Sequence, residues 1–146
     1  MTNKVEASTV LLRVVLGISF FIHGLVKFQG GIGNTAGWFD SIGIPGSLAY
    51  AVALIEMIGG FALIIGLGTR IVSALLAVVM LGAIFTAKLP AGFLGDGVGA
   101  GYELDIAFMA IAIFLAVNGS RILAVDGIIS KTKQHKQESS QSVYWL

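Results

Sequence analysis

The chain has 146 residues, of which 56% are hydrophobic and only 12% are charged, whereas a soluble domain usually carries about 25% charged residues. Because so apolar a chain could not cover its surface in water, the composition predicts an integral membrane protein with a single domain. A net charge of +1 provides no basic surface for nucleic acid. The absence of cysteine excludes disulfides, iron–sulfur clusters and c-type haem attachment.

Four apolar runs follow one another along the chain, each close to the roughly 20 residues that a membrane-spanning helix needs. The expected helices cover about residues 8–28, 47–67, 70–88 and 103–123. No small-residue cleavage site follows the first run, so we expect a retained helix rather than a signal peptide. The sequence therefore predicts an all-α transmembrane four-helix bundle over residues 1–130, followed by a polar cytoplasmic tail over residues 131–146.

The positions of lysine and arginine predict the orientation of this bundle. Of the nine such residues, only Lys27 and Lys88 lie on the side of the bundle away from the chain termini. We therefore expect a multi-pass protein of the plasma membrane with both termini in the cytoplasm. The glycine-rich segments 30–46 and 89–101 read as loops that face outward.

Glycines within the apolar runs are the next structural signal. Gly17 and Gly24 lie in the first run, and Gly59, Gly60 and Gly66 lie in the second. Small residues let helix backbones approach closely in a membrane, so these glycines predict a tightly packed bundle. Glycine-rich faces left exposed would also permit a homo-oligomer.

The first run contains charged residues, which are unfavourable in a membrane helix because a charged side chain at mid-bilayer costs about 2.5–3.5 kcal/mol. At about 100° per residue, Arg13, Phe20 and Lys27 share one face, and His23 lies about 80° from Arg13. Arg13 and Lys27 could simply extend to the membrane interfaces. His23 is better explained by a functional role, because histidine is the side chain type best suited to proton transfer under physiological conditions.

Acidic residues in the later runs supply possible partners. Glu56 lies near the middle of the second run, where His23 or Lys27 could pair with it, as a structural ion pair or in a functional site. Glu103 opens the fourth run, where a carboxylate also suits the helix dipole. Asp105 lies about 200° around that helix from Glu103 and is expected to be solvated or capping.

These side chains together predict a polar pocket in the outer half of the membrane. Its polar members are expected to be His23, Lys27, Glu56 and Glu103, with Lys88 nearby, and its aromatic walls Phe20, Phe28 and Trp38. Apolar pockets with a few convergent polar groups suit small planar ligands. No metal site is expected, since the possible ligands are few and scattered. The glycine pattern of residues 31–36 follows a membrane helix rather than a strand, so no dinucleotide site is expected.

From about Leu11 to Asp126 the chain resembles the DoxX family of small four-helix membrane proteins. The resemblance rests on the order and spacing of short motifs. They are Arg13 with Phe21-Ile22-His23-Gly24-Leu25-Val26-Lys27-Phe28, Ile42-Gly43-Ile44-Pro45, Ile55-Glu56-Met57-Ile58-Gly59-Gly60, Gly66-Leu67-Gly68-Thr69-Arg70, Tyr102-Glu103 and Gly119-Ser120-Arg121-Ile122-Leu123-Ala124-Val125-Asp126. Where many relatives close with Gly-x-Gly, this chain has Asn118-Gly119-Ser120.

Within the family the chain most resembles the CatD/MhqP-like branch, which is described as oxidoreductase and associated with catechol and quinone stress. The resemblance implies a membrane oxidoreductase component that acts on or near quinones or catechols, with menaquinone or a catechol-derived quinone as its ligand. His23, Lys27, Glu56 and Glu103 would then be catalytic, and Phe20, Phe28, Trp38 and Arg13 would contact the ligand.

No haem or flavin motif is evident, so electrons would come from a soluble redox partner. Two other functions stay open: a membrane scaffold that holds a soluble oxidoreductase without chemistry of its own, and a transporter of small aromatic compounds with Glu56 as the proton-coupling carboxylate.

Overall fold

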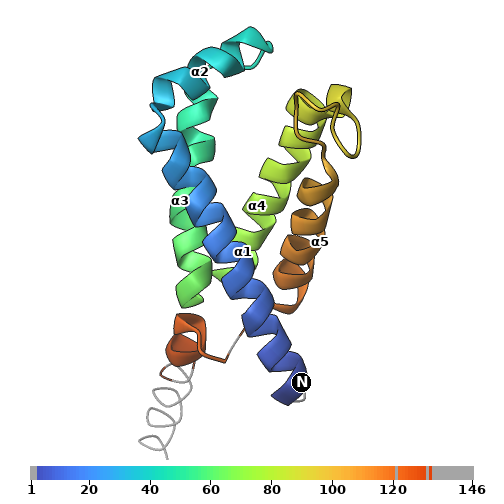
Figure 1. The fold of residues 1–146 in the computed structure, drawn as a ribbon. Coiled ribbons are helices and arrows are strands. Elements are labelled where there is room, and N and C mark those ends of the chain that lie inside the picture. The colour runs from blue at the N-terminus through green and yellow to red at the C-terminus, as the bar shows by residue number, and fades with distance from the viewer. Residues whose placement is uncertain (1–2, 121, 131, 133–146) are drawn as a thin grey trace, which may run out of the picture.

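The computed structural model describes residues 3–120, 122–130 and 132, and in these residues the fold is all-α, as predicted. Its labelled helices are α1 (Asn3–Gln29), α2 (Ile32–Ser41), α3 (Ser47–Ile65), α4 (Thr69–Ala83) and α5 (Glu103–Asn118), of which α2 is short and the other four are long (Figure 1). Residues 125–130 are also helical. A π-helical turn (Ile84–Lys88) and a 3₁₀ turn (Leu89–Ala91) extend α4. The predicted polar tail lies outside the described residues, apart from Thr132.

Three of the long helices are long and apolar enough to cross a membrane, over residues 4–29, 47–65 and 69–91. The helix expected over residues 103–123 ends earlier, at Asn118. Its 16 residues rise about 24 Å, whereas the hydrocarbon core of a bilayer is about 30 Å thick. Gly119 ends α5 with a φ of 69°, a backbone conformation that glycine adopts readily.

The distribution of side chains suits a lipid environment. Large apolar side chains point outward on every long helix; Leu11, Ile58, Ile71 and Val117 are 60–72% exposed. Three charged residues within the described part of the long helices, Arg13, Glu56 and Asp105, are instead buried inside the bundle. Apolar atoms outside and paired polar groups inside are the arrangement that a bilayer favours.

The long helices form two pairs, α1 with α3 and α4 with α5 (Figure 1). Glycines allow α1 and α3 to touch along their backbones: a Cβ atom on Gly24 would lie 2.5 Å from the Met57 nitrogen, and one on Gly17 would lie 2.8 Å from the Gly60 oxygen. The prediction that these glycines permit close packing is confirmed.

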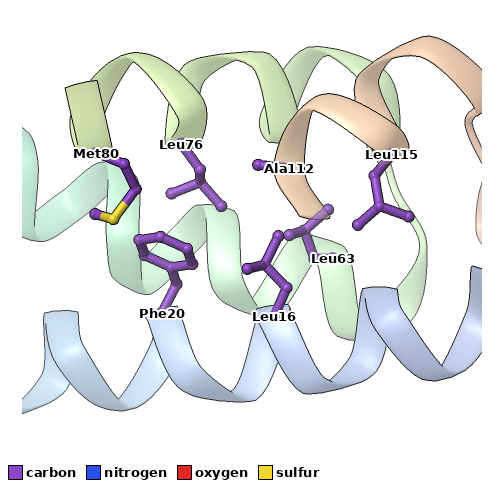
Figure 2. Packing of buried hydrophobic residues seen from close by; sticks show 7 residues of the cluster. All are labelled: Leu16, Phe20, Leu63, Leu76, Met80, Ala112 and Leu115. Atoms are coloured by element: carbon purple, nitrogen blue, oxygen red, sulfur yellow. The ribbon is translucent and has the colours of Figure 1, made fainter. Parts of the chain in front are cut away.

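One apolar core joins the two pairs (Figure 2). Each of the four long helices contributes to it, through Leu16, Phe20, Leu63, Leu76, Met80, Ala112 and Leu115. This core holds the bundle together in its middle part, and the polar features of the molecule lie towards the two ends.

The segment 30–46, predicted to be a loop, contains the helix α2, so that part of the prediction is wrong. Its Gly33 and Gly37 lower the intrinsic helix propensity, which is why the pattern is typical of a loop. Tertiary structure offsets that cost: α2 buries Phe39, and the Asp40 carboxylate accepts a hydrogen bond of 2.8 Å from the Gly46 backbone.

Candidate functional site

A cavity of about 470 Å³ lies between the two helix pairs. The pairs diverge towards the end of the bundle where α2 lies (Figure 1). Trp38 and Phe39 of α2 line the cavity. Most of the lining is apolar. The charged or titratable side chains among the described lining residues are His23, Lys27, Glu56, Lys88 and Asp105. A cavity of this size and character can hold a small organic ligand.

The first polar group is an ion pair between α1 and α3. Lys27 Nζ donates to Glu56 Oε2 over 2.5 Å. The Glu56 side chain is only 5% exposed, whereas that of Lys27 is 23% exposed. Gly24 brings α1 against α3 one turn before Lys27, so the glycine contact also positions the pair. Of the two partners expected for Glu56, the structure selects Lys27.

A second ion pair lies across the other helix pair. Lys88 Nζ donates to Asp105 Oδ2 over 2.6 Å, and the two side chains are 32% and 6% exposed. Lys88 is the last residue of the π-helical turn, whose Thr86 and Ala87 also line the cavity. Such turns often occur at functional sites, because the extra residue rotates the side chains that follow it.

His23 and the aromatic rings complete the lining. His23 lies one turn before Lys27 on α1 and remains exposed. Phe20 of α1 and Phe108 of α5 meet with ring centroids 5.8 Å apart, and Trp38 contacts Phe39 edge-on at 5.5 Å. Aromatic faces beside charged hydrogen-bond donors offer a planar ligand both stacking and polar contacts.

Two residues expected in the pocket lie outside its lining. Glu103 is exposed at the start of α5, and Asp105 occupies the cavity side of that helix instead. The expectation that Glu103 and Asp105 point to different sides of α5 agrees with the structure, but the expectation that Glu103 lines the pocket is wrong. The sequence does not show which side of α5 meets the π-helical turn. Phe28 is partly buried on α1 and does not line the cavity either.

Arg13 was expected to reach the membrane interface or to contact the ligand. The first expectation is wrong, because the residue is buried inside the bundle, and contact with a ligand stays a prediction. Its side chain is 1% exposed and lies outside the cavity lining. The guanidinium donates to Ser120 Oγ at 3.0 Å and to the backbone oxygens of Ile122 at 3.4 Å and Leu123 at 2.6 Å. Arg13 therefore holds the chain that leaves α5 against α1.

Asp126 strengthens the same end of the bundle, a role that sequence reasoning missed. Its carboxylate accepts from the backbone N–H groups of Gly68 at 2.9 Å and Thr69 at 3.1 Å. These groups open α4 and have no partner within the helix, so a carboxylate is favourable there. The contact joins the start of α4 to the segment that contains Asp126.

The helices of membrane length and the internal cavity define a small helical membrane protein with room for a ligand. The chain belongs to the DoxX family, whose model matches residues 8–89.

Three proteins illustrate the relationship. A Bacillus subtilis (strain 168) protein named "Putative oxidoreductase CatD" is 46% identical over 140 residues, which cover 96% of this chain and 100% of that protein. A protein of Mycobacterium tuberculosis (strain ATCC 25618 / H37Rv), described as an uncharacterized membrane protein, is 31% identical over 85% of this chain and 82% of its own. An uncharacterized protein of Haemophilus influenzae is 30% identical over 79% of this chain and 85% of its own. No solved structure matches the chain.

Proposed function

We propose that this protein is the membrane component of an oxidoreductase and binds quinones or catechol-derived compounds in the cavity. The observation that carries the proposal is the composition of that cavity, in which aromatic walls surround two lysine–carboxylate pairs and an exposed histidine. The similarity to a protein named as an oxidoreductase supports the redox class.

The side chains suit the chemistry of a quinone. Reduction of a quinone to its hydroquinone adds two electrons and two protons, and negative charge develops on the ring oxygens. Ammonium groups such as that of Lys27 stabilise that charge where it forms. His23 is exposed to the cavity and is the side chain suited to donate a proton near neutral pH. Glu56 holds the Lys27 ammonium in place through their ion pair.

In this proposal, a soluble redox protein docks at the membrane and donates the electrons. The chain itself supplies the ligand site and the protons. The proposal places the protein in the plasma membrane with both termini in the cytoplasm, and α5 is proposed as a fourth, shorter span beside the three helices of membrane length. The distribution of lysine and arginine supports this orientation. In the structure, the start of α1 and the helical residues 125–130 lie at one end of the bundle, and α2 lies at the other (Figure 1).

Identification of the bound molecule tests the proposal. Wild-type protein purified in mild detergent is extracted with organic solvent, and the extract is searched for quinones and hydroquinones by mass spectrometry. His23→Ala is the test variant. Ile22→Ala is the matched control, because Ile22 is the neighbouring residue, is 50% exposed and does not line the cavity.

A quinone that copurifies with wild type and Ile22→Ala, and is depleted in His23→Ala, supports the proposal. If no variant carries a quinone and added quinones do not bind, the proposal fails and a scaffold role without chemistry takes its place. Uptake of aromatic compounds into protein-containing vesicles without any reductant would instead establish transport.

A further inference from the structure

Each helix pair of the bundle contains one lysine–carboxylate ion pair. In each half of the bundle, a lysine near the end of the first helix bonds to a carboxylate on the second: Lys27 of α1 to Glu56 of α3, and Lys88 after α4 to Asp105 of α5. Both halves also run in the same direction, with α1 and α4 rising towards the end where α2 lies (Figure 1).

This repetition places one ammonium on each wall of the cavity. The α1/α3 pair forms one side and the α4/α5 pair the other, and all four charged residues line the space between them. Each lysine is more exposed than its carboxylate, at 23% and 32% against 5% and 6%. An ammonium has three N–H donors, and its bond to the carboxylate uses one, so both lysines can still donate to a ligand.

The charges also limit what the ligand can be. Two ammonium groups and two carboxylates leave these four side chains without net charge. A neutral ligand that accepts hydrogen bonds therefore suits the cavity better than an anion, which would have to displace a buried carboxylate from its partner. The aromatic walls add a preference for a flat ring.

From this arrangement we infer that the ligand is a para-quinone, held across the cavity with one carbonyl oxygen on each lysine. The inference rests on the proposed function and narrows it: an ortho-quinone, the kind derived from a catechol, has both oxygens on one edge and could reach only one wall.

Three ligands of nearly the same size separate these possibilities. Anthraquinone has carbonyl groups on opposite edges of its central ring, phenanthrenequinone is its isomer with adjacent carbonyls, and anthrone has a single carbonyl. Their affinities for purified protein in detergent would be measured by titration. The variants remove one whole ion pair at a time, so that no charge is left unpaired: Lys27→Met with Glu56→Gln, Lys88→Met with Asp105→Asn, and the two sets combined.

Anthraquinone is expected to lose about tenfold in affinity in each paired variant and about a hundredfold in the combination, since one charge-assisted hydrogen bond disappears at each wall. Anthrone and phenanthrenequinone can turn to the wall that remains, so either paired variant alone should change their affinity by less than about threefold, and the combination by about tenfold.

Two results would overturn the inference while leaving the proposed function intact. One is that the affinity for anthraquinone falls in only one of the two paired variants. The other is that the affinity for phenanthrenequinone falls about tenfold in each of them. If none of the three ligands binds wild-type protein, the proposed function itself fails. Circular dichroism of each variant establishes that it retains wild-type helicity before its affinity is compared.

Discussion

Removing either partner of the Lys27–Glu56 pair should lower the free energy of unfolding, but by different amounts. At 2.5 Å, the attraction between unit charges is about 7 kcal/mol for an effective dielectric constant of about 20, before desolvation is subtracted. The Glu56 side chain is 5% exposed and that of Lys27 is 23% exposed. Most of the desolvation therefore falls on the carboxylate, which cannot recover water if its partner is lost.

Lys27→Met should accordingly lower the free energy of unfolding by about 3–5 kcal/mol, the usual cost of leaving a buried charge unpaired. Glu56→Gln should cost only about 1–2 kcal/mol, because the Lys27 ammonium can be hydrated from the cavity and the amide oxygen still accepts its hydrogen bond. The combined variant should cost less than Lys27→Met alone, since it leaves no unpaired charge.

Unfolding in mixed micelles of mild detergent and dodecyl sulfate, followed by circular dichroism, measures these differences. Lys88→Met and Asp105→Asn are the matched comparison, because that pair shows the same asymmetry, with exposures of 32% and 6%. The reasoning is refuted if Glu56→Gln costs as much as Lys27→Met, or if the combined variant is no more stable than Lys27→Met.

Three further predictions follow from the packing and from the two ends of the bundle. Gly24→Ala should lower the unfolding free energy by about 1–3 kcal/mol, because the new methyl group meets the α3 backbone; Gly82→Ala, with nothing within 4 Å, should raise it by about 0.5–1 kcal/mol in the same unfolding assay. Arg13→Lys should speed amide hydrogen exchange over residues 122–130, since a lysine cannot reach all three acceptors of the guanidinium; unchanged exchange would contradict the role given to Arg13. Asp105→Asn should weaken quinone binding in a titration and Glu103→Gln should not, because only the former side chain lines the cavity; equal effects would show that Glu103 also acts at the site.

Much of this architecture could be predicted from the sequence, because the bilayer imposes strong local rules. Apolar runs of sufficient length must become helices, since no other open structure satisfies its backbone in lipid. Charges inside such runs must find partners, which pointed to Lys27, Glu56 and His23 near one another. The role of glycines that face a neighbouring helix, such as Gly24, could also be predicted from the sequence, because close packing of helices in lipid requires small residues.

Other features depend on which segments meet in three dimensions, and only the tertiary structure decided them. The helix α2 forms in spite of its glycines because it can bury Phe39. Asp105 rather than Glu103 enters the cavity because the π-helical turn places Lys88 on that side of α5. Arg13 is buried because backbone oxygens from a segment more than a hundred positions away in the chain accept its hydrogen bonds. The local sequence shows that glycines disfavour a helix and that burying a charge is unfavourable. It does not show the tertiary contacts that make these arrangements stable.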